Sequence, residues 1–460
     1  MAFKDRSKLS FAENATDLLR LAGPLMLGQL AVVGMTVTDI YMAGKINSDT
    51  LAALQLGGTF WSFISLLVIG VMIGNSPIIG NYWGAGKRDR VRFQFQQSLW
   101  LAVPIGILVC LAILASIDLL SYLDISDTVY NTAQGYLQPF MLTGLMFPAF
   151  FAFRSSFEGI GDTKPAMVFN CLAFVLNAIF DYILMFGKFG LPAMGGVGAA
   201  WATVLVMLFL LISMALYARY GAKIKDLKLY SELARPHRGA ITKILALGIP
   251  ISLSLSAEMS FFAIIPLMIA HLGSNVLGAH AIAVNLDALV FMLPLGIGQA
   301  LTIMVAHAQG ANNPVAAKLI CSTGFKVVFL IALVFGAIKI FFGGHLATLF
   351  SPNLGVTLIA TNLFFFSAIL GLCDCLQISA SCALRGFKDT QMPLVIQVTA
   401  FWIVAFPVSY SLALTDIFGP PLGVYGFWVG LIMAAFIAAI GLLYRWRFIS
   451  TKFIAATGPE

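Results

Sequence analysis

Hydrophobic residues form long runs from one end of the chain to the other, and short stretches rich in Gly, Pro and charged residues separate them. The runs reach or exceed the ~20 residues that an α-helix needs to cross a bilayer, and the longer ones leave room for tilt. The pattern predicts an all-α integral membrane protein with twelve transmembrane helices. The expected helices cover roughly residues 17–42, 51–79, 95–116, 129–153, 164–187, 196–218, 241–269, 276–306, 315–343, 356–383, 392–414 and 421–444.

The second half of the sequence resembles the first half at an offset of about 226 residues. Four short matches occur in the same order in both halves, which indicates an internal duplication. The matched pairs are LAGP (21–24) with LGIP (247–250), WGAGK (83–87) with QGANN (309–313), GIGDTKPAM (159–167) with GFKDTQMPL (386–394), and GVGAAW (196–201) with GVYGFW (423–428).

Each repeat holds six of the expected helices, and an even number of crossings returns the chain to its starting side. The two halves therefore share one membrane orientation, and we expect two pseudo-symmetric six-helix lobes around a central cleft. The expected boundaries are an N-terminal lobe at residues 1–218, a basic cytoplasmic linker at 219–243 and a C-terminal lobe at 244–460.

Composition supports the membrane assignment, because 60% of the 460 residues are hydrophobic and only 10% are charged. The net charge of +7 comes from Lys and Arg grouped in alternate loops, so it predicts both termini on the cytoplasmic side rather than nucleic-acid binding. The polar N-terminal stretch is not followed by a cleavage site of a removable signal peptide. The loops on the opposite side contain only Lys45, Lys188 and Lys339.

Five carboxylates interrupt the apolar runs, and they are the strongest functional signal in the chain. An ionisable group at bilayer depth costs about 3 kcal/mol on insertion scales, so such groups usually line an ion path or a water-filled cavity. We expect no strongly basic residue at comparable depth, so these acids should bind a proton, a metal cation or a cationic substrate. The five acids are Asp39, Asp181, Glu258, Asp287 and Asp374.

In the N-terminal lobe, Asp39 lies near the end of the first expected helix. Asn177 and Asp181 are four residues apart on the fifth helix, so they share one face. Thr203 lies in the first half of the sixth helix. Carboxylate, amide and hydroxyl oxygens suit a hard cation such as Na⁺ or a proton-bearing network, although Asn177 and Thr203 equally fit hydrogen bonding between helices.

In the C-terminal lobe, Glu258 lies in the middle of the seventh helix and Asp374 lies in the tenth. Gln377 shares a face with Asp374. If the two helices are neighbours, the two acids share a cation or one proton. Asp287 on the eighth helix fits local hydrogen bonding as well as it fits coupling.

The acids are absent from their repeat-related positions, so each lobe has its own polar site. The counterpart of Asp39 is Ile265, and the counterpart of Glu258 is Val32.

Pro24 removes one hydrogen bond from the first helix and so kinks it. The kink is either static or a bend that changes with the state of Asp39. Thirty-eight Phe and 18 Met residues offer an adaptable aromatic lining for flat organic cations.

Motifs for other chemistry are missing from the sequence. GAGK (84–87) lacks the upstream Gly and the following Ser or Thr of a Walker A loop, so ATP-driven pumping within the chain is not expected. The five His residues form no ligand spacing, and the six Cys residues lie in apolar runs as packing residues. We expect no enzyme activity and no cofactor.

The chain resembles the multidrug and toxic compound extrusion (MATE) transporters, and their NorM branch in particular. The resemblance is carried along nearly the whole chain by LAGPLMLGQL (21–30), TDIYMAG (38–44), GDTKP (161–165), GIPISLSLSAE (248–258) and the segment from Asp374 through LRGFKDTQMP. It implies a bacterial inner-membrane antiporter in which an inward Na⁺ or H⁺ gradient drives export of cationic, aromatic drugs. We expect a monomer among membrane lipids, with no nucleic-acid partner.

The resemblance also implies roles for individual residues. Asp39, Asn177, Asp181 and Thr203 match the N-lobe cation or proton site; Glu258 and Asp374 match the acids of the C-lobe; Pro24 matches the proline of helix-one bending. Leu370 replaces an aromatic residue found in some NorM members, and Asp181 replaces an Asn, so both H⁺ and Na⁺ coupling stay open.

Three other functions are weaker interpretations. A lipid-linked saccharide flippase of the same two-lobe plan should offer buried Arg or Lys to a pyrophosphate, whereas this sequence offers acids. An ion channel usually repeats its filter residues symmetrically, and these acids are asymmetric. A membrane enzyme would need a nucleophile with its base, or a metal cluster.

Overall fold

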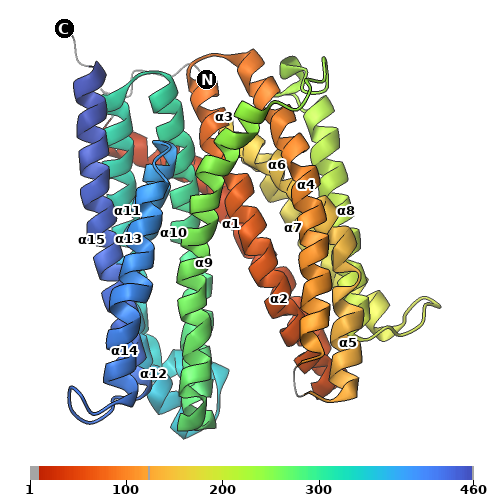
Figure 1. The fold of residues 1–460 in the computed structure, drawn as a ribbon. Coiled ribbons are helices and arrows are strands. Elements are labelled where there is room, and N and C mark those ends of the chain that lie inside the picture. The colour runs from red at the N-terminus through yellow and green to blue at the C-terminus, as the bar shows by residue number, and fades with distance from the viewer. Residues whose placement is uncertain (1–9, 123–124, 458–460) are drawn as a thin grey trace. The chain divides into compact units, whose positions relative to one another are not determined.

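The computed structural model describes residues 10–122 and 125–457. Within these residues, twelve segments are long and apolar enough to cross a membrane, which confirms the predicted all-α multi-pass architecture (Figure 1). The α-helices are α1 (Phe11–Ile46), α2 (Ser48–Ile73), α3 (Asn75–Gly84), α4 (Arg88–Leu120), α5 (Asp127–Leu137), α6 (Phe140–Gly159), α7 (Lys164–Phe186), α8 (Gly196–Tyr220), α9 (Arg238–Ile269), α10 (Ser274–Gly310), α11 (Pro314–Phe350), α12 (Leu354–Gly386), α13 (Gln391–Val398), α14 (Phe406–Leu414) and α15 (Val424–Thr457).

Three of the spans are interrupted rather than continuous. Gly74 separates α2 from α3, and the Gln138–Pro139 step separates α5 from α6, where proline has no N–H to continue the helix. The eleventh span contains the π-helix η4 (Thr399–Ala405) between α13 and α14. Short 3₁₀ turns η2 (Lys225–Leu227) and η3 (Ala270–Leu272) flank α9.

The chain divides into two compact units, and each boundary falls inside a helix. One unit is Leu27–Ser252; the other combines Leu253–Glu460 with the described part of Met1–Met26. The first part of α1 therefore packs with the C-terminal repeat, and the first part of α9 packs with the N-terminal repeat. The lobe boundaries expected from the sequence, at residues 218 and 244, lie elsewhere and stay a prediction.

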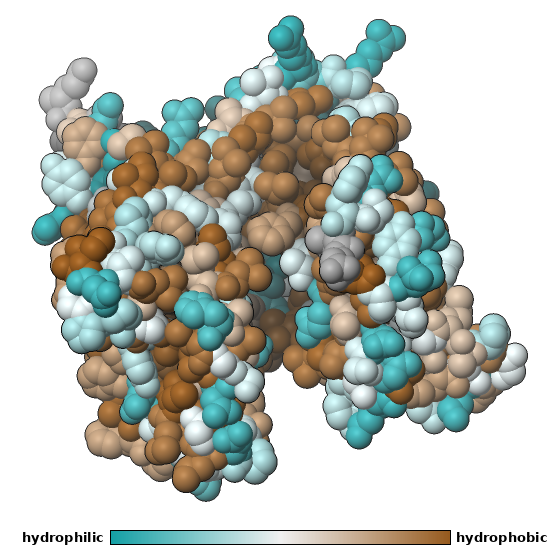
Figure 2. Space-filling view, turned by 60° about the horizontal axis from the view of Figure 1, so that its bottom comes forward, coloured by the Kyte–Doolittle hydropathy of each residue, from teal (hydrophilic) through white to brown (hydrophobic). Residues whose placement is uncertain are grey.

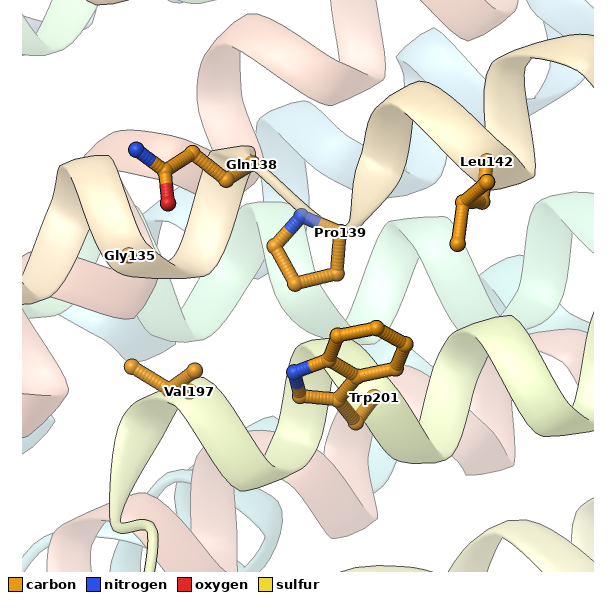
Figure 3. Close-up of a pocket in the computed structure, with 6 residues that line it drawn as sticks. All are labelled: Gly135, Gln138, Pro139, Leu142, Val197 and Trp201. Carbon is orange, nitrogen blue, oxygen red and sulfur yellow. The ribbon is translucent and has the colours of Figure 1, made fainter.

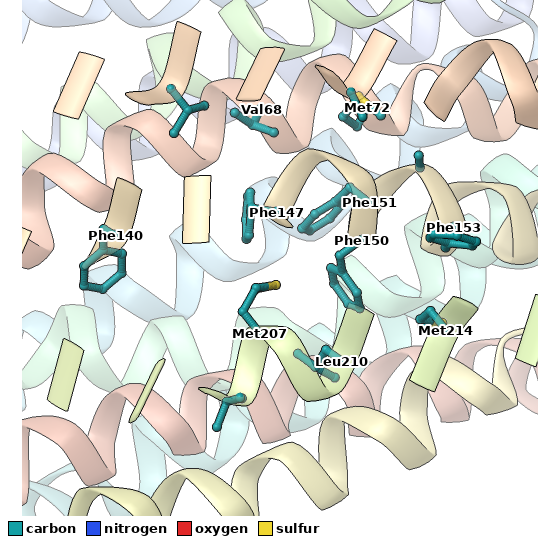
Figure 4. Packing of buried hydrophobic residues seen from close by; sticks show 14 of the residues in the cluster. Val68, Met72, Phe140, Phe147, Phe150, Phe151, Phe153, Met207, Leu210 and Met214 are labelled. Carbon is teal, nitrogen blue, oxygen red and sulfur yellow. The ribbon is translucent and has the colours of Figure 1, made fainter. Parts of the chain in front are cut away.

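The core of the Leu27–Ser252 unit is rich in phenylalanine. Helix α6 packs against α3, α4 and α8 and presents Phe147, Phe150 and Phe151 to its neighbours (Figure 4). The Phe147 and Phe151 ring centroids lie 4.9 Å apart in a tilted arrangement, which suits aromatic quadrupoles. This dry core holds the helices that carry the N-lobe acids.

In the second unit, α12 is the central helix and contacts α10, α11 and α15. Small residues let the backbones approach closely, as is typical of membrane helices. A Cβ on Gly298 would lie 2.9 Å from the sulfur of Cys382, and a Cβ on Gly386 would lie 2.7 Å from Val305. Helices α10 and α12 are therefore locked side by side.

The internal repeat is visible in the three-dimensional contacts. A Cβ on Gly70 would collide with Ser252 in one unit, and a Cβ on Gly296 would collide with Met26 in the other. Both the two glycines and their two partners are 226 positions apart in the sequence. The same contact has therefore been kept in both halves.

Two tight turns also repeat with the same backbone and different residues. Gly86 and Asn312 both adopt positive φ after the second span of their half, at 71° and 54°. Gly161 and Lys388 do so after the fourth span, at 81° and 63°. Asn tolerates the left-handed region better than most residues, whereas Lys is strained there.

An aspartate directly after each of these fourth-span turns ties its loop to the sixth span. Asp162 accepts hydrogen bonds from the Tyr217 hydroxyl at 2.6 Å and from the Lys223 ammonium at 3.0 Å. Its repeat counterpart Asp389 accepts from the Arg445 guanidinium at 2.6 Å. The DT dipeptide of the sequence repeat thus has a structural explanation.

The outer faces of the helices carry exposed apolar side chains such as Leu108, Leu330 and Phe341. Figure 2 shows broad hydrophobic areas interrupted by groups of hydrophilic residues. Such a surface is stable only when lipid replaces water around it.

Candidate functional site

The Leu27–Ser252 unit brings Asp39, Asn177 and Asp181 together. Helix α1 approaches α7 closely because Gly28 leaves room beside Met167 and Asn170. About three helical turns further along both helices, Asp39 interacts directly with Asp181 and Asn177.

Four oxygens of this cluster are buried without a hydrogen-bond partner. Asn177 and Asp181 are almost completely inaccessible to solvent. Neither carboxylate oxygen of Asp181, nor Oδ1 of Asp39, nor Oδ1 of Asn177 has a hydrogen-bond partner within the described part of the chain. Two carboxylates in contact cannot both stay charged in such a place on their own. Either one of them takes up a proton, or a cation binds to both.

Tyr136 on α5 is a fourth member of this cluster that sequence reasoning missed. It interacts electrostatically with both Asp39 and Asp181, and its ring packs against Phe140 with centroids 5.0 Å apart. Thr203 lies on α8, where its hydroxyl donates to the Ala199 carbonyl of its own helix at 3.0 Å. Its assignment to the site stays a prediction.

The second unit brings Glu258 and Asp374 into one electrostatic cluster. The Gln377 side chain on α12 donates a 3.1 Å hydrogen bond to Glu258 on α9, and both residues are buried. Asp374, one turn before Gln377, interacts with Glu258 and also with Asp287. Helices α9 and α12 are therefore close enough for the two acids to share an ion.

Asp287 is paired with a base, which corrects the sequence analysis. Lys339 lies inside α11 rather than in a loop, and its ammonium forms an ion pair with Asp287. It also donates to the Ser367 hydroxyl at 2.8 Å, and that hydroxyl donates to Asp287 at 2.5 Å. Lysine, aspartate and serine thus form a closed ring between α10, α11 and α12.

The expectation that no basic residue lies at the depth of the acids is therefore wrong. Besides Lys339, Arg385 on α12 is buried and interacts electrostatically with Glu258. In the other unit Arg154 is buried on α6 and forms a 2.7 Å ion pair with Glu158. Buried bases are stable here because each has an acid nearby.

Pro24 lies inside α1, two residues before the point where this helix passes from one compact unit to the other. A proline at this position removes one helical hydrogen bond, so α1 is weakest close to that boundary. The role of Pro24 in helix bending stays a prediction.

A pocket of about 230 Å³ lies at the break between α5 and α6, beside α8 (Figure 3). It has no ionisable side chain, so it does not match the chemistry of the acid clusters. Within the described residues, no group of three or more His, Cys, Asp or Glu side chains is arranged to hold a metal ion. The lining residues are Gly135, Gln138, Pro139, Leu142, Val197 and Trp201.

A multi-pass helical bundle with acids inside its spans, in each of two units, is typical of a membrane transporter. The chain belongs to the MatE family, the multidrug and toxic compound extrusion transporters, whose family model matches residues 24–183 and 250–411. The two matched segments begin 226 residues apart, at the offset of the internal repeat.

Bacterial relatives match the chain along nearly its whole length. The multidrug resistance protein NorM of Photobacterium profundum is 32% identical, over 96% of this chain and 97% of that protein. The multidrug resistance protein PmpM of Pseudomonas aeruginosa is 35% identical, over 95% of this chain and 92% of that protein. The NorM-type identification from sequence motifs is confirmed.

Solved structures share the fold at lower sequence identity. A crystal structure of MATE in complex with MaL6 matches with a TM-score of 0.84 and 22% identity, covering 95% of this chain and 97% of that one. The eukaryotic MATE transporter AtDTX14 matches with a TM-score of 0.82 and 18% identity, covering 97% and 99%.

Proposed function

We propose that this protein is a secondary active exporter that exchanges cationic, aromatic drugs for inward-moving H⁺ or Na⁺ by alternating access. The observation that carries the proposal is the cluster of Asp39, Asn177 and Asp181, in which four buried oxygens have no hydrogen-bond partner. Oxygens in this situation gain stability from a proton or a hard cation, and that gain is what a coupled transporter needs.

The N-lobe cluster is proposed as one coupling site, with Thr203 as an additional oxygen ligand. Glu258 and Asp374 are proposed as the C-lobe coupling site, supported by the hydrogen bond from Gln377 to Glu258. Pro24 is proposed as the position at which α1 bends when the N-lobe site changes its occupancy. The domain plan of two lobes, a linker at 219–243 and a drug-binding cleft is part of the same proposal.

The substrates are proposed to be small organic cations, in keeping with relatives named multidrug resistance proteins. Burial of an aromatic cation among Phe and Met side chains, with a carboxylate in reach, supports this chemistry. We further propose a monomer in the inner membrane, in contact with lipids, with both termini in the cytoplasm as the distribution of Lys and Arg indicates.

A flippase for lipid-linked saccharides is not favoured. Lys339 is a buried base of the kind that a pyrophosphate requires, but it is already ion-paired with Asp287. A basic residue that is already paired offers little to a dianionic substrate.

Reconstitution in liposomes tests the proposal. Ethidium movement is followed by fluorescence under an imposed Na⁺ gradient and, separately, under an imposed pH gradient. Movement with the Na⁺ gradient alone favours coordination by carboxylates, and movement with the pH gradient alone favours protonation. Failure of both gradients, together with translocation of a lipid-linked saccharide, would overturn the exporter assignment.

Neutral variants then assign the two sites. We expect Asp39→Asn, Glu258→Gln and Asp374→Asn each to abolish gradient-driven ethidium export at matched protein levels. A variant of the exposed Asp118, Asp118→Asn, serves as the control and should transport like the unmodified protein. Unchanged export in all three site variants would contradict the assignment of the acids.

A further inference from the structure

The ring of Asp287, Lys339 and Ser367 has no part in the coupling site proposed above for Glu258 and Asp374. Lys339 is only 5% exposed, and its ammonium forms the ion pair with Asp287 inside the membrane-spanning part of three helices. Replacing such a pair by apolar residues is often neutral or stabilising, so its presence is not explained by stability. Buried ionisable groups in membrane spans usually have a functional role.

The pair is specific to the second half of the chain. At an offset of 226 or 227 residues, the counterpart of Lys339 is Ile113 or Ala112, and Asp287 falls on Trp61 or Phe60. An inherited structural pair would be expected in both halves. The pair therefore belongs to a property that distinguishes the C-terminal unit.

Acidic side chains outnumber basic ones in the electrostatic cluster around the ring. Three carboxylates, those of Glu258, Asp287 and Asp374, interact with two bases, Lys339 and Arg385. The cluster thus holds one negative charge more than its own bases neutralise, and one monovalent cation or proton completes it. The one positive charge that the cluster lacks is the charge of a single Na⁺ or H⁺.

Lys339 has two acids within its electrostatic range. It is bonded to Asp287, and it also interacts with Asp374, on the neighbouring helix α12. Ser367 and Asp374 are seven residues apart on α12, which is about 10 Å along the helix, so the ammonium reaches Asp374 by combining its four flexible methylenes with a shift of α11 along α12. Ser367 bonds both Lys339 and Asp287, which fixes the state that the structure shows.

We propose that Lys339 is a tethered cation that competes with the transported ions, and that Asp287 is the carboxylate that receives the cationic group of the drug. This rests on the proposed antiport function. With a coupling ion bound at Glu258 and Asp374, Lys339 stays on Asp287 and blocks it. When the ion leaves, Lys339 neutralises Asp374, and Asp287 becomes free for the drug. The exchange of one ammonium thus makes ion and drug binding mutually exclusive.

The test measures ethidium binding to the full-length protein in detergent, by fluorescence anisotropy. Binding is titrated with and without NaCl at alkaline pH, and again at acid pH, with N-methylglucamine chloride keeping ionic strength constant. In the unmodified protein, the coupling ion should weaken ethidium binding at least ~5-fold, the lower end of ordinary allosteric coupling.

The variants separate the tethered cation from a structural ion pair. Lys339→Gln should bind ethidium tightly whether or not the coupling ion is present, because Asp287 stays free. Asp287→Asn should bind ethidium weakly under both conditions. Lys339→Arg keeps a cation in place, so it should retain at least part of the ion effect.

The charge-balanced double variant Lys339→Gln/Asp287→Asn keeps the test decisive if a single variant fails to fold. The proposal expects weak ethidium binding that no longer depends on the ion. Behaviour like that of the unmodified protein would mean that the pair is structural, and it would overturn the proposal. The other buried pair provides a matched control, because Arg154→Gln/Glu158→Gln should preserve the ion effect.

Two failures are distinguishable. If the unmodified protein neither binds nor transports ethidium, the proposed function is wrong. If it does both, and Lys339→Gln keeps the same ion effect on binding, only the role of Lys339 and Asp287 is wrong.

Discussion

Replacing Asp181 by Asn should make the protein more stable while it abolishes coupling. Asp181 is fully buried, lies against Asp39, and has no donor to either carboxylate oxygen. Asn has nearly the same shape, removes one negative charge, and offers an N–H₂ group to the unsatisfied oxygens of Asp39 and Asn177. Substitution of a buried residue usually lowers the stability of a protein, and here we expect it to raise the stability.

The magnitude follows from the contact between two carboxylates. Two like charges about 4 Å apart repel by about 4 kcal/mol at an effective dielectric constant of ~20. Protons or cations already relieve much of this in the unmodified protein, so we expect a gain of about 1–2 kcal/mol for Asp181→Asn. For a unit of ~150–250 residues, each kcal/mol raises the melting temperature by about 2–4 °C.

The assay is thermal unfolding in detergent, followed by tryptophan fluorescence at one heating rate for all proteins, so that the melting temperatures are directly comparable. In alkaline buffer without Na⁺, Asp181→Asn should melt about 2–8 °C higher. Acid or NaCl should raise the melting temperature of the unmodified protein more than that of the variant, because ligands stabilise the state that binds them.

Two results would refute this reasoning. One is a lower melting temperature of Asp181→Asn in ion-free buffer. The other is an equal response of both proteins to acid and to NaCl. The exposed Asp118→Asn is the matched control, and it should change stability by no more than about 0.5 kcal/mol.

Further predictions concern packing, turns and the loop contacts. Gly198→Ala places a Cβ 2.7 Å from the backbone of α7, so it should lower the melting temperature by the equivalent of about 1–3 kcal/mol in the same assay. Gly86→Ala forces alanine into a left-handed turn with no steric contact, so it should cost about 1 kcal/mol, whereas Asn312→Gly at the repeated turn should be neutral or stabilising by thermal unfolding. Arg445→Gln leaves a largely buried aspartate without its partner, and we expect a loss of about 1–2 kcal/mol, with partial recovery in Arg445→Lys, by the same measurement.

The twelve spans were predictable because bilayer thickness fixes a minimum apolar length, and each run meets it. The ends of the helices were not predictable, because several helices continue through polar residues. For example, α1 begins at Phe11, and α15 continues to Thr457. The break at Pro139 has a sequence signal in the proline itself. The π-helix at Thr399–Ala405 ends two residues before Pro407, which signals a disturbed helix but not a π-helix in particular.

Lys339 shows that the pattern of apolar segments and loops does not reveal the partner of a charged residue. Its segment, GAIKIFFGGH, lies near the end of the apolar run 315–343, so the sequence alone assigns its charge to the adjoining loop. The charge of Lys339 inside α11 is compensated by its partner Asp287, 52 positions away in the sequence. An ion pair between two helices cannot be inferred from either helix alone.

Tyr136 was missed for a different reason. A tyrosine enters a membrane helix without the large penalty of an acid, so its presence in an apolar run attracts no attention. The acids were found because their burial is expensive, whereas the aromatic residue beside them is ordinary in composition. Only the three-dimensional fold brings Tyr136 within electrostatic range of Asp39 and Asp181.

The exchange of half-helices between the two units has a consequence for the origin of the chain. The unit boundaries after Met26 and after Ser252 are 226 positions apart, so each repeat gives its first half-helix to the other repeat's unit. A single repeat on its own would therefore lack part of its unit and would leave one half-helix without a place to pack. An ancestor of half the present length could complete its fold only as a domain-swapped homodimer, in which each copy supplied the half-helix that the other lacked. In the present chain the exchange is intramolecular, and the contacts of Gly70 with Ser252 and of Gly296 with Met26 hold each exchanged half-helix in its unit.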